Sequence, residues 1–175
     1  MAFVHLGTRR VFVTPGTFQP DAVWMETKAR ALLDYAAAEQ LPCEIVTRDY
    51  DGMFSMAFDQ VFKDRSIQVK PVGPHAPNLN AFIERWIQSL QHEALHHFII
   101  FGKEHFDQIV VAYVAYYTER RPHQVIGNVL LPQRGADPNG PGVNTEPSME
   151  PLSLADFRCE SRLGGLLKYF YRQAA

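Results

Sequence analysis

The chain has 175 residues, 46% of them apolar and 21% charged, and its net charge of −2 provides no overall basic field to favour a nucleic-acid partner. No apolar run reaches the roughly 18 residues of a membrane span, and the N-terminus does not resemble a signal peptide. The two cysteines, Cys43 and Cys159, fit no metal-binding spacing, so we expect a reduced, cytoplasmic setting.

The hydrophobic pattern predicts alternating strands and helices along most of the chain. Short β-branched and aromatic runs indicate strands, and apolar residues at helical spacing indicate amphipathic helices. In chain order we predict a hairpin of strands 2–6 and 10–14, a helix within 17–40, a strand at 43–47, a helix at 53–64, a strand at 67–72, and helices at 78–97 and 103–119.

An initial hairpin followed by strand–helix–strand units predicts an α/β fold, with a mixed sheet flanked by helices. We assign residues 1–128 to this core. Residues 129–151 are rich in proline and glycine and are typical of an irregular linker. Residues 152–175 form a short basic tail, which we expect to dock as a helix.

Two acidic residues stand at positions typical of functional groups. Asp49 follows a buried strand, and ligand-binding groups collect at the carboxyl ends of parallel strands. Glu84 lies in the first turns of the helix at 78–97, where the helix dipole favours an anion. One helix–strand–loop unit separates them, so the fold can bring them together. Mg²⁺ is a usual cation between close carboxylates, although acids at such positions also arise by chance.

Three motifs together resemble a known family. "RDYDGMF" (48–54) is followed by "PHAPNLNAFIERWIQSLQHEALHH" (74–97) and then by "YYTERRPHQVIGN" (116–128). This set resembles the integrase core of bacterial insertion-sequence transposases, which have a ribonuclease-H-like fold similar to that of retroviral integrases. The resemblance runs from about residue 2 to residue 128 and resumes in the tail.

The resemblance implies Mg²⁺-dependent (or Mn²⁺-dependent) DNA cleavage and strand transfer, as in DNA integration and recombination. By position, Asp49 is the second and Glu84 the third acid of the catalytic and metal-binding triad, whereas Asp51 is a turn residue. The partners implied are transposon-end and target DNA and a homo-oligomer, and the chain would be cytoplasmic and nucleoid-associated when bound.

The first acid of the family is missing from this sequence. In the family it lies on the first, central strand, and no aspartate here precedes Asp21, which begins the first helix. We therefore expect weakened metal binding and no significant catalysis by this polypeptide alone. We also expect either an empty slot where the central strand would lie or direct pairing of strands 2–6 and 43–48.

Two functional hypotheses follow. In one, the chain is the C-terminal part of an active transposase whose start lies upstream or whose reading frame is split. In the other, it is a decayed remnant that at most binds DNA or a transposase. The DNA sequence upstream of the Met1 codon distinguishes them, because an in-frame strand with an aspartate supports the first.

Five polar residues are candidate DNA contacts. The resemblance implies that the helix face carrying Glu84 points toward DNA, and Gln88 and Gln91 share that face. Arg120, Arg121 and His123 follow the last helix and are of types that contact phosphates. Each has an ordinary alternative. The glutamines can simply lie on the solvent-exposed surface, and the basic residues can interact favourably with the C-terminal end of the helix dipole.

A second pattern indicates different chemistry. "HEALH" (92–96) matches the H-E-x-x-H signature of zinc proteases, with Glu93 as base. The pattern is short, and only Glu119 is available as a distant third ligand. A solvated helix face accounts for the same residues.

Overall fold

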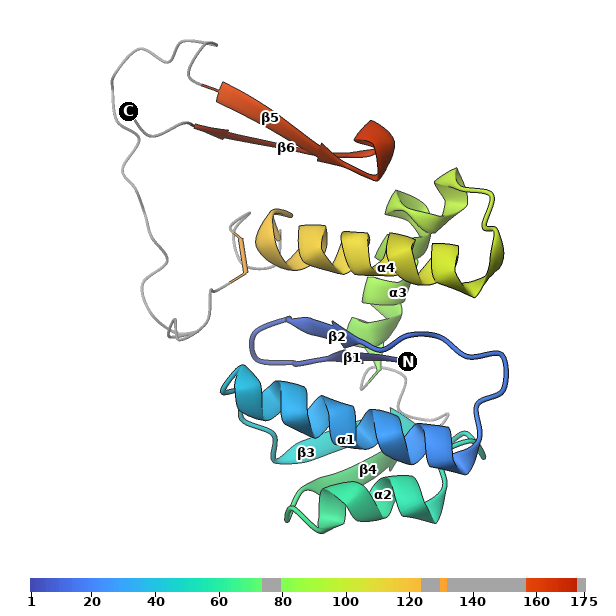
Figure 1. Ribbon diagram of the computed structural model, residues 1–175. Coiled ribbons are helices and arrows are strands. Elements are labelled where there is room, and N and C mark those ends of the chain that lie inside the picture. The colour runs from blue at the N-terminus through green and yellow to red at the C-terminus, as the bar shows by residue number, and fades with distance from the viewer. Residues whose placement is uncertain (74–79, 124–129, 132–156, 173–175) are drawn as a thin grey trace.

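The computed structural model describes residues 1–73, 80–123, 130–131 and 157–172. Within these residues the chain is a mixed α/β fold of four α-helices and three two-stranded sheets (Figure 1). The α/β class and the order of elements up to residue 119 are as predicted. The helices are α1 (Ala22–Ala38), α2 (Met56–Lys63), α3 (Ala81–Glu93) and α4 (Gly102–Glu119), and the strands before them or between them are β1 (Ala2–Val4), β2 (Val11–Val13), β3 (Ile45–Asp49) and β4 (Gln68–Val72).

The N-terminal elements form two small sheets that α1 and α2 cover. β1 and β2 are an antiparallel hairpin, whereas β3 and β4 pair in parallel from Ile45 opposite Gln68 to Asp49 opposite Val72. A helix between two strands makes this parallel crossover possible. The core under these helices is built on the most deeply buried apolar side chains of α1 and α2, which are Met25, Ala29, Phe58 and Phe62.

Side-chain caps fix where these two helices begin. Asp21 accepts a hydrogen bond from the Trp24 backbone N–H at 2.7 Å at the start of α1, and Ser55 accepts one from Phe58 N–H at 3.3 Å at the start of α2. Such caps satisfy backbone donors that have no partner within the helix. Asp21 therefore has a structural role, as its position in the sequence predicts.

An open slot separates β1 from β3. Among the strands that the structure describes, β1 pairs only with β2 and β3 only with β4, so these two strands do not pair with each other. A cavity of about 560 Å³ lies between them, lined by every residue of both strands and closed on one side by α1. His5 spans one end, where its Nε2 donates to the Pro42 carbonyl at 3.1 Å. Of the two expected arrangements, the structure has the slot and not direct pairing.

A second core joins α3, α4 and the hairpin. Trp86 and Leu90 of α3 pack against Ile109 and Tyr113 of α4, and Val11 of β2 completes the cluster. α4 therefore lies over the hairpin, with α3 behind it (Figure 1). The apolar spacing that predicts these two helices is the spacing of their buried faces.

The tail is a β-hairpin, so the expected docked helix is wrong. β5 (Phe157–Arg162) pairs antiparallel with β6 (Leu167–Arg172). The turn between them holds Leu163, Gly164 and Gly165 at positive φ, a conformation that interrupts a helix and that glycine adopts at little cost. Leu167 is buried in the α3–α4 core and fastens the hairpin to it. Most of the predicted linker, 129–151, lies outside the described residues.

Candidate carboxylate site

β3 delivers Asp49 to the surface at its carboxyl end. The preceding residue, Arg48, makes a two-pronged ion pair with Asp59 of α2, with both nitrogen–oxygen distances at 2.8 Å. Its guanidinium also lies 5.2 Å from the ring centre of Phe54. Two parallel charge-assisted hydrogen bonds define both direction and distance, so this pair locks the end of β3 against α2.

The two acids after β3 have different surroundings. Asp51 turns back on its own backbone, with Oδ1 accepting from Met53 N–H at 2.9 Å and its carbonyl accepting from Phe54 N–H at 3.1 Å. This is the local bonding typical of an aspartate in a turn. Asp51 is therefore a turn residue, as predicted. Asp49 is exposed as well, but its carboxylate makes no such bonds within the turn and can bind a ligand.

Asn80 joins Asp49 to the start of α3. Its side-chain amide donates to Asp49 Oδ1, and its backbone carbonyl accepts from Glu84 N–H at 3.0 Å. Glu84 is thus in the first turn of α3, one turn from the residue that contacts Asp49. Both carboxylates are exposed. The helix N-terminus adds a positive dipole beside them.

This donor set suits a divalent cation that keeps much of its water. Asp49 and Glu84 supply carboxylates, and Asn80, whose Nδ2 is used by Asp49, retains its amide oxygen. Mg²⁺ commonly takes one or two protein carboxylates and completes its shell with water and phosphate. Among the described residues no group of three or more His, Cys, Asp or Glu side chains converges on a metal position. Asp49 and Glu84 are therefore candidate ligands for a weakly held Mg²⁺ or Mn²⁺.

Comparison with known protein families bears on the same part of the chain. Residues 65–130 match the integrase core domain. The resemblance seen in the sequence is confirmed over this stretch, which is less than half of the chain. A comparison with curated proteins gives no match. None of the helices in the described residues is long and apolar enough to cross a membrane.

The match to the integrase core domain covers one carboxylate and not the other. Glu84 lies inside residues 65–130, as do β4, α3 and α4, whereas Asp49 precedes them. Asp49 is linked to the matched segment by the parallel pairing of β3 with β4 and by Asn80. The roles of both residues stay predictions, supported by this geometry.

The structure separates the five candidate DNA contacts of the integrase core into two groups. Gln88 and Gln91 are exposed on α3, and Arg120 is exposed with its guanidinium 4.8 Å from the ring centre of Tyr169. These three side chains are accessible to a ligand. Arg121 and His123, in contrast, have partners within the protein.

Arg121 and His123 stabilise the end of α4. Arg121 donates to Glu93 through Nη2 at 2.7 Å and Nε at 3.0 Å, and these bonds raise its pKa. His123 is 7% exposed and donates through Nε2 to the Tyr117 carbonyl at 3.0 Å. Burial lowers the pKa of His123, because the charged ring would lose hydration.

The zinc-protease pattern does not form a helical metal site. α3 ends at Glu93, and residues 95–97 form a separate 3₁₀ turn. Glu93 accepts hydrogen bonds from Arg121 and from the Tyr113 hydroxyl, the latter at 3.1 Å, so it is held as a structural anion. The rings of His92 and His96 stack edge-to-face at 5.1 Å, and the described residues offer no three-ligand set.

Sequence reasoning missed the residues that hold Asp49 in place. Arg48 and Asp59 are separated in the sequence by a turn and the start of a helix, and only the folded structure shows that they form an ion pair. Asn80 stands directly before the helix carrying Glu84, and asparagine at such a boundary is read first as an N-cap. Here it has no capping side-chain bond and contacts Asp49 instead.

Proposed function

We propose that this chain is an integrase core of ribonuclease-H-like fold that acts on DNA phosphodiesters, with Asp49 and Glu84 as its metal-binding carboxylates. One observation carries the proposal, which is that Asn80 ties the carboxylate at the end of β3 to the first turn of the helix bearing Glu84. The order of strands across the slot, β2–β1 and then β3–β4, agrees with a ribonuclease-H-like sheet that lacks its central strand.

In this proposal each residue has a defined task. Asp49 and Glu84 hold the cation through one carboxylate each, and Asn80 orients the Asp49 carboxyl group by donating to Oδ1. The cation, when bound, supplies a polarised oxygen nucleophile and charge stabilisation on the phosphate. Exposed Gln88 and Gln91 lie one and two turns beyond Glu84 and contact the DNA that presents the phosphate.

The described residues supply only two of the three acids of the family, so we propose that catalysis needs a further strand in the slot. That strand would pair with the open edges of β1 and β3 and would bring its own aspartate beside Asp49. The alternative is a remnant that only binds DNA or a transposase.

A nicking assay tests the proposal. The purified chain is incubated with supercoiled plasmid and Mg²⁺ or Mn²⁺, with and without an added apolar peptide strand that carries one central aspartate. We expect no nicking without the peptide and metal-dependent nicking with it. The matched controls are the same peptide with asparagine in place of aspartate, and the Glu84→Gln chain.

Each result has a defined meaning. Strong Mg²⁺-dependent nicking by the chain alone, lost in Glu84→Gln, would show that two acids suffice and that the incompleteness proposal is wrong. No nicking under any condition, together with stop codons directly upstream of the Met1 codon, would favour the remnant.

A further inference from the structure

A second cavity lies on another side of α3 from the carboxylates. It has a volume of about 1100 Å³ and is bounded by the turn between β1 and β2, by α3, by the C-terminal end of α4 and by the start of β6. Phe82, Arg85, Ser89 and Glu93 line it from α3. Their spacing of three or four residues places them on one helix face, whereas Glu84, Gln88 and Gln91 occupy a different face.

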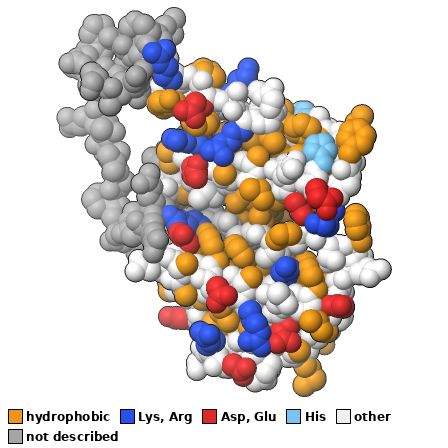
Figure 2. Space-filling view, viewed as in Figure 1, with side chains coloured by type: hydrophobic (Ala, Val, Ile, Leu, Met, Phe, Trp, Pro, Cys, Tyr) orange, Lys and Arg blue, Asp and Glu red, His pale blue; other side chains and the backbone are white. Residues whose placement is uncertain are grey.

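Arginine side chains dominate the charge of this groove, which we call the Arg9–Arg85 groove. Arg9, Arg85 and Arg121 line it, and Glu93, paired with Arg121, is the single acid among the described residues that do so. Figure 2 shows Lys and Arg side chains, with acidic side chains among them, near the C-terminal hairpin and the end of α4. In a chain of net charge −2, this is a local excess of positive charge suited to an anion.

Both the backbone and the side chain of Arg9 have unusual features. Its backbone has a φ of 61°, in the left-handed region, and its guanidinium lies 3.6 Å from the ring centre of Phe82. Its Nη1 atom is buried and has no hydrogen-bond partner among the described residues. A buried donor without a partner is costly, and each such atom calls for an explanation. A phosphate that draws the guanidinium toward the groove would satisfy this donor.

The walls of the groove contain aromatic side chains beside these cations. Phe82, Tyr116 and Tyr117 line it together with Arg9 and Arg85. Proteins that bind single-stranded nucleic acids combine cationic groups along the path of the phosphate backbone with aromatic rings on which the bases stack. A duplex keeps its bases stacked inside and cannot present them to these rings. Lys168, at the start of β6, also lines the groove and adds a further cation to its wall.

We propose that the Arg9–Arg85 groove binds a single nucleic-acid strand, with backbone phosphates at Arg9 and Arg85 and a base against the tyrosine wall. This surface differs from the carboxylate site and needs no metal, so it goes beyond the proposed catalysis. Arg121 contributes to the positive wall while its pairing with Glu93 keeps it in place.

Fluorescence anisotropy in EDTA tests the proposal, using a labelled oligothymidine of about 12 nucleotides. We expect Arg85→Gln to weaken binding several-fold and Arg9→Gln with Arg85→Gln to weaken it about tenfold or more. The slope of log affinity against log salt should shrink by about 0.7 for each lost phosphate contact. Arg65→Gln, which removes an exposed cation beyond α2, is the matched control and should bind as the parent does.

Several results would overturn the proposal. They are unchanged affinity in the double variant, equal loss in Arg65→Gln, duplex binding as tight as that of the single strand, or full displacement by inorganic phosphate at equal concentration. Arg85 is exposed, so its variant remains informative if Arg9→Gln unfolds. The Asp49→Asn, Glu84→Gln double variant should keep metal-free binding, and this separates the groove from the proposed catalysis.

Discussion

Replacing Asp59 by asparagine should destabilise the protein more than most single charge changes, because Asp59 is the anchor for the end of β3. The Arg48 and Asp59 side chains are 11% and 15% exposed, and two hydrogen bonds of 2.8 Å join them. Asparagine preserves the volume and one acceptor but removes the charge. It therefore leaves a largely buried guanidinium without its counter-ion.

The expected size of the effect follows from this burial. Removing one partner of a buried ion pair costs about 3–5 kcal/mol, and the retained amide oxygen and residual solvent access reduce this to about 2–3 kcal/mol. For a chain of this size the loss corresponds to a fall in Tm of about 4–12 °C. Urea unfolding followed by circular dichroism measures it.

Glu26→Gln is the control for the Asp59 experiment. Glu26 pairs with Arg30 on the exposed side of α1, where the two side chains are 36% and 62% exposed. Such surface pairs contribute about 0.3–0.5 kcal/mol. If Asp59→Asn lowers the free energy of unfolding by no more than Glu26→Gln does, the Arg48–Asp59 pair does not anchor β3 and the reasoning is refuted.

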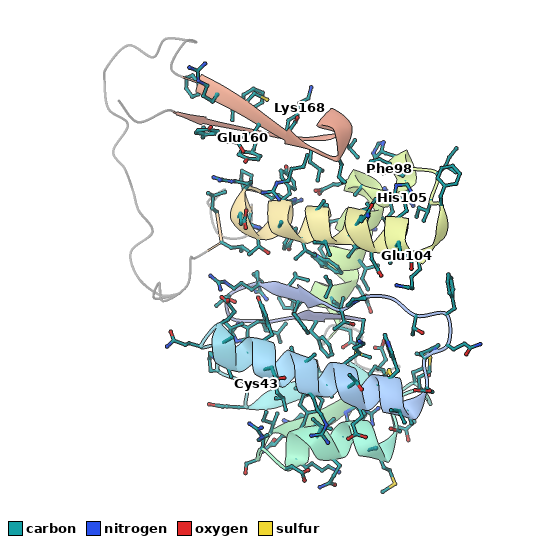
Figure 3. All side chains as sticks on the ribbon, viewed as in Figure 1. Cys43, Phe98, Glu104, His105, Glu160 and Lys168 are labelled. Atoms are coloured by element: carbon teal, nitrogen blue, oxygen red, sulfur yellow. The ribbon has the colours of Figure 1, made fainter. Side chains whose placement is uncertain are left out.

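Three further predictions concern the slot, the end of α4 and the carboxylates. Cys43 lines the slot (Figure 3), and burial raises the pKa of its thiol, whereas Cys159 is exposed. Iodoacetamide should therefore modify Cys159 first, and a peptide strand bound in the slot should slow the modification of Cys43 alone. Equal modification rates of the two cysteines, measured by mass spectrometry, would contradict this. Burial lowers the pKa of His123 in the folded protein below the ordinary value of about 6.5 for histidine, so the unfolded chain takes up this proton first. Stability should then fall as pH drops below about 6.5, and in urea titrations His123→Gln should show less of this loss than the parent. Asn80→Ala should weaken Mg²⁺ binding in calorimetry with DNA present, because Asp49 loses its hydrogen-bond donor, while Asn144→Ala in the proposed linker should not.

The helices of the first 119 residues follow from hydrophobic period, because their buried residues recur mostly every three to four positions, and the strands follow from short β-branched and aromatic runs. The C-terminal hairpin does not follow as easily. The run "GGLLKYFYR" is apolar enough for a docked helix, and its strand character depends on pairing with residues 157–162. The Gly164–Gly165 pair between two strand-like runs was the available signal for a tight turn.

The positions of the two candidate acids could be read from the sequence, whereas the contacts that support them could not. Asp49 follows a strand and Glu84 opens a helix, and both positions can be read along the chain. The contact of Asn80 with Asp49 depends on how the end of β3 meets the start of α3, which no local pattern encodes. The pairing of Arg121 with Glu93 likewise depends on the packing of α3 against α4, so a basic run that looks free in the sequence is partly neutralised in the fold.

The backbone on the two edges of β3 does not constrain Asp49 equally. β3 has a full ladder with β4 on one edge, whereas its other edge faces the slot. The remaining constraints are side chains, namely the Arg48–Asp59 pair below the strand and Asn80 beyond its end. Catalytic groups need placement within about 0.5 Å, which rigid neighbours on both sides provide best. A strand bound in the slot would therefore do more than add an aspartate, because it would also give β3 its second ladder and fix Asp49 relative to Glu84.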